Sequence, residues 1–185
     1  MAGVVRAGKG RALGCSNFTA EQLRTADATS RSRGIARFVS VQNEYSMLHR
    51  EPEQEVLDEC RRLGIAFLPY FPLANGLLTG KYRLGKPVPE GSRLSSGARA
   101  PLTLNEGNLK MVERLSGFAE EHGHTLLELA ISWLLAHTPV ASVIAGATRA
   151  SQARGNAASA EWRLSAEELK AANDLLTGAE AAPAV

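Results

Sequence analysis

The sequence has few aromatic residues, few cysteines and little excess charge of either sign. Aromatic side chains make up 5% of the 185 residues, and two cysteines occur, Cys15 and Cys60. Two cysteines cannot form a disulfide framework, so we expect reduced thiols and a cytoplasmic protein. The 21 basic and 19 acidic side chains nearly balance, at a formal net charge of +2. This balance gives no electrostatic reason to expect nucleic acid or an anionic membrane as a partner.

Long apolar runs and metal-binding patterns are also missing. No run approaches the roughly 18–20 residues that a membrane-spanning helix needs. Residues 1–12 carry three basic side chains but no apolar segment typical of a secretory signal. No two of the four histidines have metal-ligand spacing, so we expect no metal site. The apolar fraction of 44% is sufficient for one domain with a hydrophobic core, spanning residues 1–185.

Short predicted strands alternate with predicted helices along the chain. Strands are predicted at 12–15, 37–42, 65–70 and 140–145. Helices are predicted at 20–32, 52–63, 105–122, 125–137, 151–160 and 165–176, several of them opened by capping boxes such as Thr19 with Gln22. This alternation predicts an α/β fold with a parallel sheet and right-handed crossovers, and the helix at 105–122 is an addition to the pattern.

Two segments and one basic cluster fall outside this pattern. Residues 81–103 are rich in Gly, Pro and Ser and are predicted to form a long flexible loop, which would either clasp a cofactor or be disordered. The tail at 178–185 is predicted to be frayed. Arg31, Arg33 and Arg37 are interpreted as a solvated helix end.

Polar and aromatic side chains follow each predicted strand. Ser16 and Asn17 follow the first strand, Gln42 ends the second, Tyr70 ends the third, and residues 146–149 follow the fourth. The carboxyl ends of parallel strands carry the active sites of such folds. Amides can bind a carboxamide, a ring can stack on a flat heterocycle, and a turn that opens a helix can hold a phosphate. We therefore expect a cradle for a cofactor with flat rings and phosphates.

Four runs in the same order and spacing resemble the C-terminal half of an aldo-keto reductase. They are GCSNF at 14–18, VQNEYS at 41–46, YFPLANGLLTGKY at 70–82 and VIAGAT at 143–148. The family is a (β/α)₈ barrel that uses NADPH to reduce aldehydes and ketones. The resemblance implies a partial TIM barrel of about four parallel βα units, because 185 residues are few for a closed barrel of typically about 250.

The resemblance also implies which residues would contact NADPH. Ser16, Asn17 and Gln42 would hold the nicotinamide carboxamide, and Tyr70 would stack on the nicotinamide ring. The pyrophosphate would be lined by the backbone after the third strand, with Lys81 nearby: Phe71, Pro72, Leu73, Gly76 and Leu78. The adenosine and its 2′-phosphate would be surrounded by Gly146, Thr148, Arg149, Gln152 and Asn156. Arg149 is a plausible partner of the 2′-phosphate, but the sequence does not decide between NADPH and NADH.

The family's catalytic Asp, Tyr, Lys and His belong to the first four strands of the barrel, and no matching motif occurs here. None of Tyr45, Tyr70 and Tyr82 has that context, so we expect no catalytic residue and no substantial reduction by this chain alone. By family, the substrate would be a small aldehyde or ketone. The alternatives are a non-catalytic binding or assembly module, a half-barrel completed by a second copy or a partner chain, and a gene fragment without a stable product.

Plainer interpretations of single residues also stand. Ser16 and Asn17 would suit an ordinary helix-capping turn, Gln42 a polar strand end, and Tyr70 a core aromatic. Trp133 and Cys60 are predicted to be core residues, because each lies on the apolar face of a helix.

Overall fold

The computed structural model describes residues 2–96 and 100–178. The elements along the chain are α1 (Ala2–Arg6), β1 (Leu13–Ser16), α2 (Ala20–Ser32), β2 (Phe38–Glu44), η1 (Glu51–Glu53), α3 (Val56–Leu63), β3 (Ala66–Tyr70), η2 (Ala74–Thr79), α4 (Ala100–Thr103), α5 (Glu106–Glu121), α6 (Leu126–Leu135), α7 (Ala150–Ala158) and α8 (Ala166–Thr177). Of the predicted tail, residues 179–185 lie outside the described residues.

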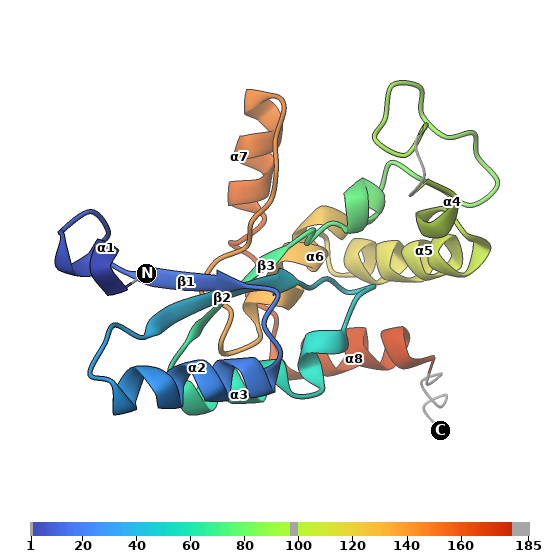
Figure 1. Cartoon of the computed structure of the whole chain (residues 1–185). Coiled ribbons are helices and arrows are strands. Elements are labelled where there is room, and N and C mark those ends of the chain that lie inside the picture. The colour runs from blue at the N-terminus through green and yellow to red at the C-terminus, as the bar shows by residue number, and fades with distance from the viewer. Residues whose placement is uncertain (1, 97–99, 179–185) are drawn as a thin grey trace.

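Three parallel strands form the sheet in the order β1-β2-β3 (Figure 1). Cys15 pairs in register with Val41, and Val41 with Phe67. Val41 and Phe67 are fully buried, and α2 and α3 lie together on one side of the sheet. Because side chains alternate between the two faces of a strand, Gln42 and Tyr70 lie on the opposite face, where they are half-buried. The predicted α/β fold is confirmed.

The predicted fourth strand at 140–145 is wrong as a regular strand. Val140 makes a single parallel bridge with Phe67, and the N–H groups of Ala141 and Ile144 donate to Phe67 and Pro69 at 3.1 and 3.0 Å. Pro69 has no N–H, so β3 cannot return the next hydrogen bond of the ladder. Within the described residues nothing pairs with the other side of 140–145. The segment therefore follows β3 without becoming a continuous strand.

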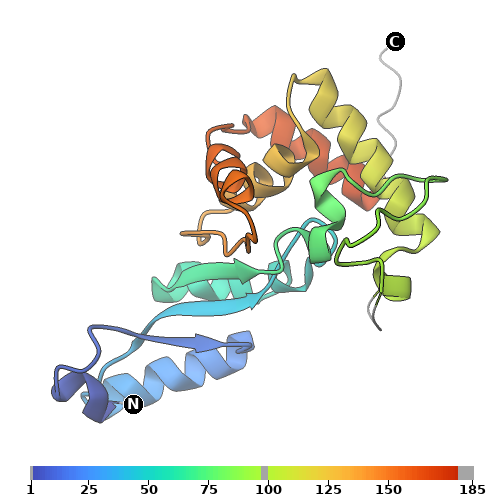
Figure 2. The ribbon, with the colours of Figure 1, turned by 90° about the horizontal axis from the view of Figure 1, so that it is seen from above.

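The predicted helix boundaries agree closely with the structure where a cap defines them. Thr19 caps α2 with Gln22, Thr125 caps α6 with Glu128, and Ser165 caps α8 with Glu168, each as a reciprocal capping box. The core beneath the sheet continues into these helices, and Trp133 and Cys60 are fully buried in it as predicted. Viewed from above, α5, α6, α7 and α8 gather beyond β3, and α1 lies at the opposite end, beside the start of β1 (Figure 2).

In its described residues, the long loop is held by a hydrogen bond to α5 and by an internal one to its own buried Tyr82. The Leu84 N–H donates to Glu113 of α5 at 3.0 Å, and the N–H of the buried Leu94 donates to the Tyr82 hydroxyl at 3.2 Å. The loop ends in α4, a short helix that the sequence pattern did not predict. Its flexibility stays a prediction.

Candidate functional site

The turn after β1 is fastened to β2 through one carbonyl group. The Ser16 hydroxyl donates to the Gln42 carbonyl oxygen at 2.8 Å, and the Asn17 N–H donates to the same oxygen at 3.0 Å. Asn17 has a φ of 59°, in the left-handed region that asparagine tolerates better than most residues. The N-cap of α2 is Thr19, so Ser16 and Asn17 do not serve as the helix cap. Both side chains are exposed at the carboxyl edge of the sheet.

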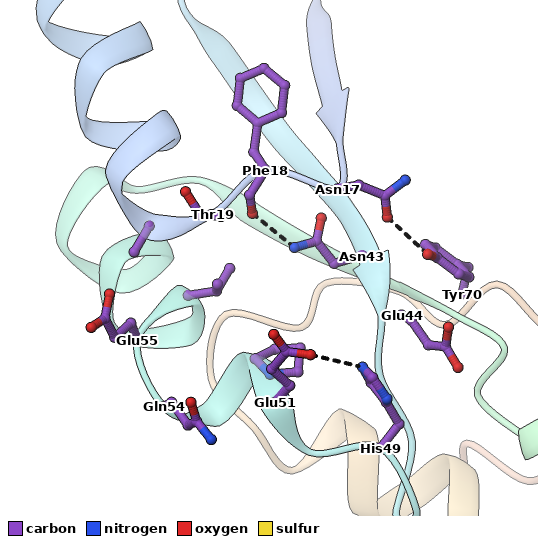
Figure 3. Close-up of a pocket in the computed structure, with 13 residues that line it drawn as sticks. Asn17, Phe18, Thr19, Asn43, Glu44, His49, Glu51, Gln54, Glu55 and Tyr70 are labelled. Carbon is purple, nitrogen blue, oxygen red and sulfur yellow. Dashed lines mark hydrogen bonds and ion pairs between the residues drawn. The ribbon is translucent and has the colours of Figure 1, made fainter.

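Tyr70 reaches the same turn from the end of β3. Its hydroxyl donates to Asn17 Oδ1 at 2.8 Å, across residues 53 positions apart in the chain (Figure 3). Its ring is half-buried and contacts Phe71 edge-on at a centroid distance of 5.3 Å, so it is not a core aromatic. The structure thus brings together Ser16, Asn17, Gln42 and Tyr70, the four residues predicted for the carboxamide and nicotinamide ring.

The backbone after β3 is tightly turned. Phe71, Ala74 and Asn75 have positive φ values of 51°, 44° and 59°, and Gly76 has 94°. A Cβ on Gly76 would lie 3.4 Å from Lys81 Nζ, so the ammonium group of Lys81 lies against this backbone. The lysine is exposed and lies 5.1 Å from the centroid of the Tyr82 ring. A positive charge therefore lies beside the predicted pyrophosphate segment.

Some backbone groups of this segment are already engaged. The Ala74 N–H donates to Phe71, and the Gly76 and Leu78 N–H groups both donate to Leu73, at 2.8 and 3.2 Å respectively. The side chains of Pro72 and Leu78 are buried, so these two residues belong to the core side of the segment. The Gly76 carbonyl is engaged too, because it accepts from the Thr79 hydroxyl at 2.7 Å, so the exposed group that this segment offers a ligand is the Lys81 side chain.

The residues predicted for the adenosine end form a separate group at the start of α7. Gln152 Oε1 accepts from the Thr148 N–H, the Thr148 hydroxyl and the Arg149 N–H at 2.9, 3.0 and 3.2 Å. Asn156 Nδ2 donates to the Gly146 carbonyl at 3.5 Å. No residue of α7 is buried, and the helix projects away from the sheet (Figure 1). The five predicted residues therefore hold one another in a solvent-facing turn.

A pocket of about 440 Å³ lies beside the strand ends, between the start of α2 and η1 (Figure 3). Asn17 and Tyr70 line it, and the other residues predicted for the cofactor do not. Sequence reasoning missed the rest of its lining as a site: Phe18, Thr19, Ala20, Asn43, Glu44, His49, Glu51, Pro52, Gln54, Glu55 and Val56. Asn43 and Glu44 directly follow Gln42 in β2, which is the signal that could have indicated them.

The lining of this pocket combines apolar side chains with polar and acidic ones. Its charged side chains are Glu44, Glu51 and Glu55, with His49 Nε2 at 3.8 Å from Glu51 Oε2. Asn43 Nδ2 donates to the Phe18 carbonyl at 2.9 Å, while its buried Oδ1 has no hydrogen-bond partner among the described residues. These groups suit neutral or cationic ligands better than anions.

The hydroxyl groups of all three tyrosines are hydrogen-bonded to other groups of the chain. Tyr45 is fully buried, its hydroxyl donates to Glu53 at 3.0 Å, and burial raises its pKa above the usual value. Tyr82 is buried against Leu94, and Tyr70 is bound to Asn17. In residues 2–96 and 100–178, no cluster of three or more metal-ligating side chains occurs, and no helix is long and apolar enough to span a membrane.

Residues 1–177 match the model of the aldo/keto reductase family, and the chain belongs to this family of oxidoreductases. It is 32% identical over 174 residues to an uncharacterized oxidoreductase YrpG from Bacillus subtilis, covering 94% of this chain and 51% of that protein. It is 32% identical to an L-glyceraldehyde 3-phosphate reductase from Escherichia coli K12, covering 84% and 46%. It is also 36% identical to a probable voltage-gated potassium channel subunit beta from Arabidopsis thaliana, covering 77% and 44%. The chain spans about half the length of the curated relatives it matches, and its three-stranded parallel sheet is consistent with a partial TIM barrel.

Proposed function

We propose that this chain binds NADP(H) at the carboxyl ends of β1, β2 and β3, as the cofactor-binding part of an aldo-keto reductase. The observation that carries the proposal is the hydrogen-bonded arrangement of Ser16, Asn17 and Tyr70 at one edge of the sheet. In the whole protein the reaction would be the reduction of a small aldehyde or ketone to an alcohol. NADPH, when bound, supplies the hydride for such a reaction.

The residues present fit the parts of this cofactor. The exposed hydroxyl and amide groups of Ser16 and Asn17, with the half-buried amide of Gln42, suit a carboxamide, and the half-buried ring of Tyr70 offers a surface for stacking. Lys81 beside the Gly76 backbone suits a pyrophosphate. Arg149, which precedes α7, would favour a 2′-phosphate and hence NADPH over NADH.

We infer that the chain alone does not reduce carbonyl compounds at enzyme rates. General acid catalysis needs a group within hydrogen-bond reach of the carbonyl oxygen and with a pKa near the working pH. Each of the three tyrosine hydroxyls already has a partner in the structure, and none of these partners is a lysine. The missing acid would have to come from another segment or chain.

A titration of the chain with NADPH and NADH, followed by cofactor fluorescence, tests the proposal. We expect saturable binding of both and a preference for NADPH that Arg149→Ala removes. Arg33→Ala is the matched control, because this arginine lies at the end of α2, far along the chain from the proposed site, and should keep the preference. Absence of saturable binding by the wild-type chain would refute the proposal.

A second candidate role is assembly with a second copy or with a partner half-barrel. It is supported by the two open edges of the sheet: within the described residues, β1 pairs only with β2, and 140–145 pairs only with β3. Open edges are prone to pair with other chains. Sedimentation of the purified chain tests this role, since a well-folded monomer at high concentration would argue against it. A cytoplasmic location stays a prediction from the two free thiols.

A further inference from the structure

Neighbouring groups occupy part of the hydrogen-bonding capacity of Ser16 and Asn17, the two side chains at the end of β1. The Tyr70 hydroxyl occupies Asn17 Oδ1 at 2.8 Å, and Figure 3 shows the side-chain nitrogen of Asn17 directed away from Tyr70. The Ser16 hydroxyl donates its hydrogen bond to the Gln42 carbonyl oxygen at 2.8 Å. Asn17 is thereby left to act as a donor through Nδ2, and Ser16 is left to act as an acceptor through Oγ.

We propose that Tyr70 is a positioning residue that fixes the orientation of the Asn17 amide, so that Asn17 and Ser16 together recognise a primary carboxamide. This inference rests on the proposed function. A primary carboxamide has one carbonyl acceptor and one NH₂ donor, which match the donor of Asn17 and the acceptor of Ser16. A carboxylate in its place has no proton to offer Ser16, so the pair discriminates between the amide and the acid.

The backbone of Asn17 is fixed by the turn, and its side-chain amide is oriented by the Tyr70 hydroxyl. Asn17 has a φ of 59°, and its N–H is held by the Gln42 carbonyl at 3.0 Å, so the backbone of the turn is fixed. Within the part of the chain that the structure describes, the side chain of Asn17 has no hydrogen bond other than the one from Tyr70. Without that hydroxyl, the exposed amide would rotate freely and present either oxygen or nitrogen.

The test compares three probes on the wild-type chain and on Tyr70→Phe, which keeps the ring and removes the hydroxyl. The probes are NADP⁺, its nicotinic acid analogue, and 2′-phospho-ADP-ribose, which lacks the pyridine ring. We expect Tyr70→Phe to weaken NADP⁺ binding by about 2- to 10-fold, the range of one net hydrogen bond. We expect the preference for NADP⁺ over the acid analogue to fall and the affinity for 2′-phospho-ADP-ribose to stay unchanged.

A double-mutant cycle separates this role from a merely structural one. Asn17→Gly keeps the positive φ of the turn and removes the amide. In that background Tyr70→Phe should have no further effect on NADP⁺ affinity, because nothing remains to be oriented. Tyr45→Phe is the control: it removes another tyrosine hydroxyl and should lower the unfolding temperature without changing the preference for the amide.

The outcomes distinguish the inference from the proposed function. If the wild-type chain binds none of the three probes, the proposed function fails and the inference fails with it. If the wild-type chain binds NADP⁺ and Tyr70→Phe weakens all three probes equally, or none of them, the positioning role is refuted and cofactor binding stands.

Discussion

Asp27 in α2 and Glu59 in α3 are buried carboxylates that form ion pairs with arginines. Asp27 accepts hydrogen bonds from Arg31 and Arg37, and Arg37 also donates to the Leu63 carbonyl at the end of α3 at 3.0 Å. Arg31 lies in the last turn of α2 and is solvent-exposed, as the interpretation of a solvated helix end requires, whereas Arg37 lies beyond the helix and is half-buried between Asp27 and Leu63. The sequence could not reveal this pairing, because Arg37 follows a glycine turn that only the fold brings back to α2.

The pairing of Asp27 makes stability depend on pH. The hydrogen bond from Arg31, more than the burial that opposes it, lowers the pKa of Asp27. A carboxyl group with a lowered pKa in the folded state stabilises the fold above its ordinary pKa of about 4, and this contribution is lost as the pH falls through the lowered value. We expect Asp27→Asn to lower the free energy of unfolding by about 1–2 kcal/mol at pH 7 and by less at pH 3.

Denaturant unfolding at both pH values measures this difference. Asp58→Asn is the matched control, because Asp58 is an exposed aspartate that pairs with Arg61 one turn away. Its effect at pH 7 should stay within about 0.5 kcal/mol. An equal loss for Asp27→Asn at pH 7 and pH 3 would contradict the assignment.

Cys60 is a second residue whose environment determines its chemistry. It is fully buried in α3, and burial raises the pKa of its thiol to about 12. Because the thiolate is the reactive form, Cys60 should not react with an alkylating reagent at pH 8 unless the protein unfolds. Mass spectrometry of the labelled chain with and without denaturant checks this, and rapid modification of Cys60 in the native protein would be the contrary result.

The first residues of the helices are the features that the sequence predicted best. A capping box is a local interaction within four residues, so Thr19, Thr125 and Ser165 marked the starts of α2, α6 and α8 without any tertiary information. The segment 140–145 was predicted less well, because its pairing depends on Pro69, a residue 71 or more positions earlier in the chain.

The glycine that ends α3 gives a test at the scale of an element. Gly64 has a φ of 65°, and a Cβ placed there would meet nothing within 4 Å, so Gly64→Ala changes only the backbone preference. We expect a loss of about 1 kcal/mol in the free energy of unfolding. Gly117→Ala, inside α5 and equally uncrowded, should instead stabilise by about 0.5–1 kcal/mol. Thermal unfolding of the two variants measures both, and a stabilising Gly64→Ala would contradict the left-handed cap.

At the scale of the whole molecule, the strand ends show what a sequence can and cannot locate. Ser16, Asn17, Gln42 and Tyr70 were predicted together because parallel strands bring their carboxyl ends to one edge. The pocket with His49 and Glu51 was not predicted, because it depends on how η1 folds back toward the start of α2. The sequence motifs predicted where the site lies. The way the loops pack around it could be seen only in the structure.

The central claim is that this chain holds the cofactor part of an aldo-keto reductase without its proton donor. The most direct measurement mixes the purified chain with NADPH and follows cofactor fluorescence, and then adds an aldehyde and follows absorbance of the reduced nicotinamide. The claim predicts saturable binding that Asn17→Gly weakens, and no aldehyde-dependent oxidation above the rate without protein. Oxidation of NADPH at ordinary enzyme rates, or no saturable binding, would contradict it.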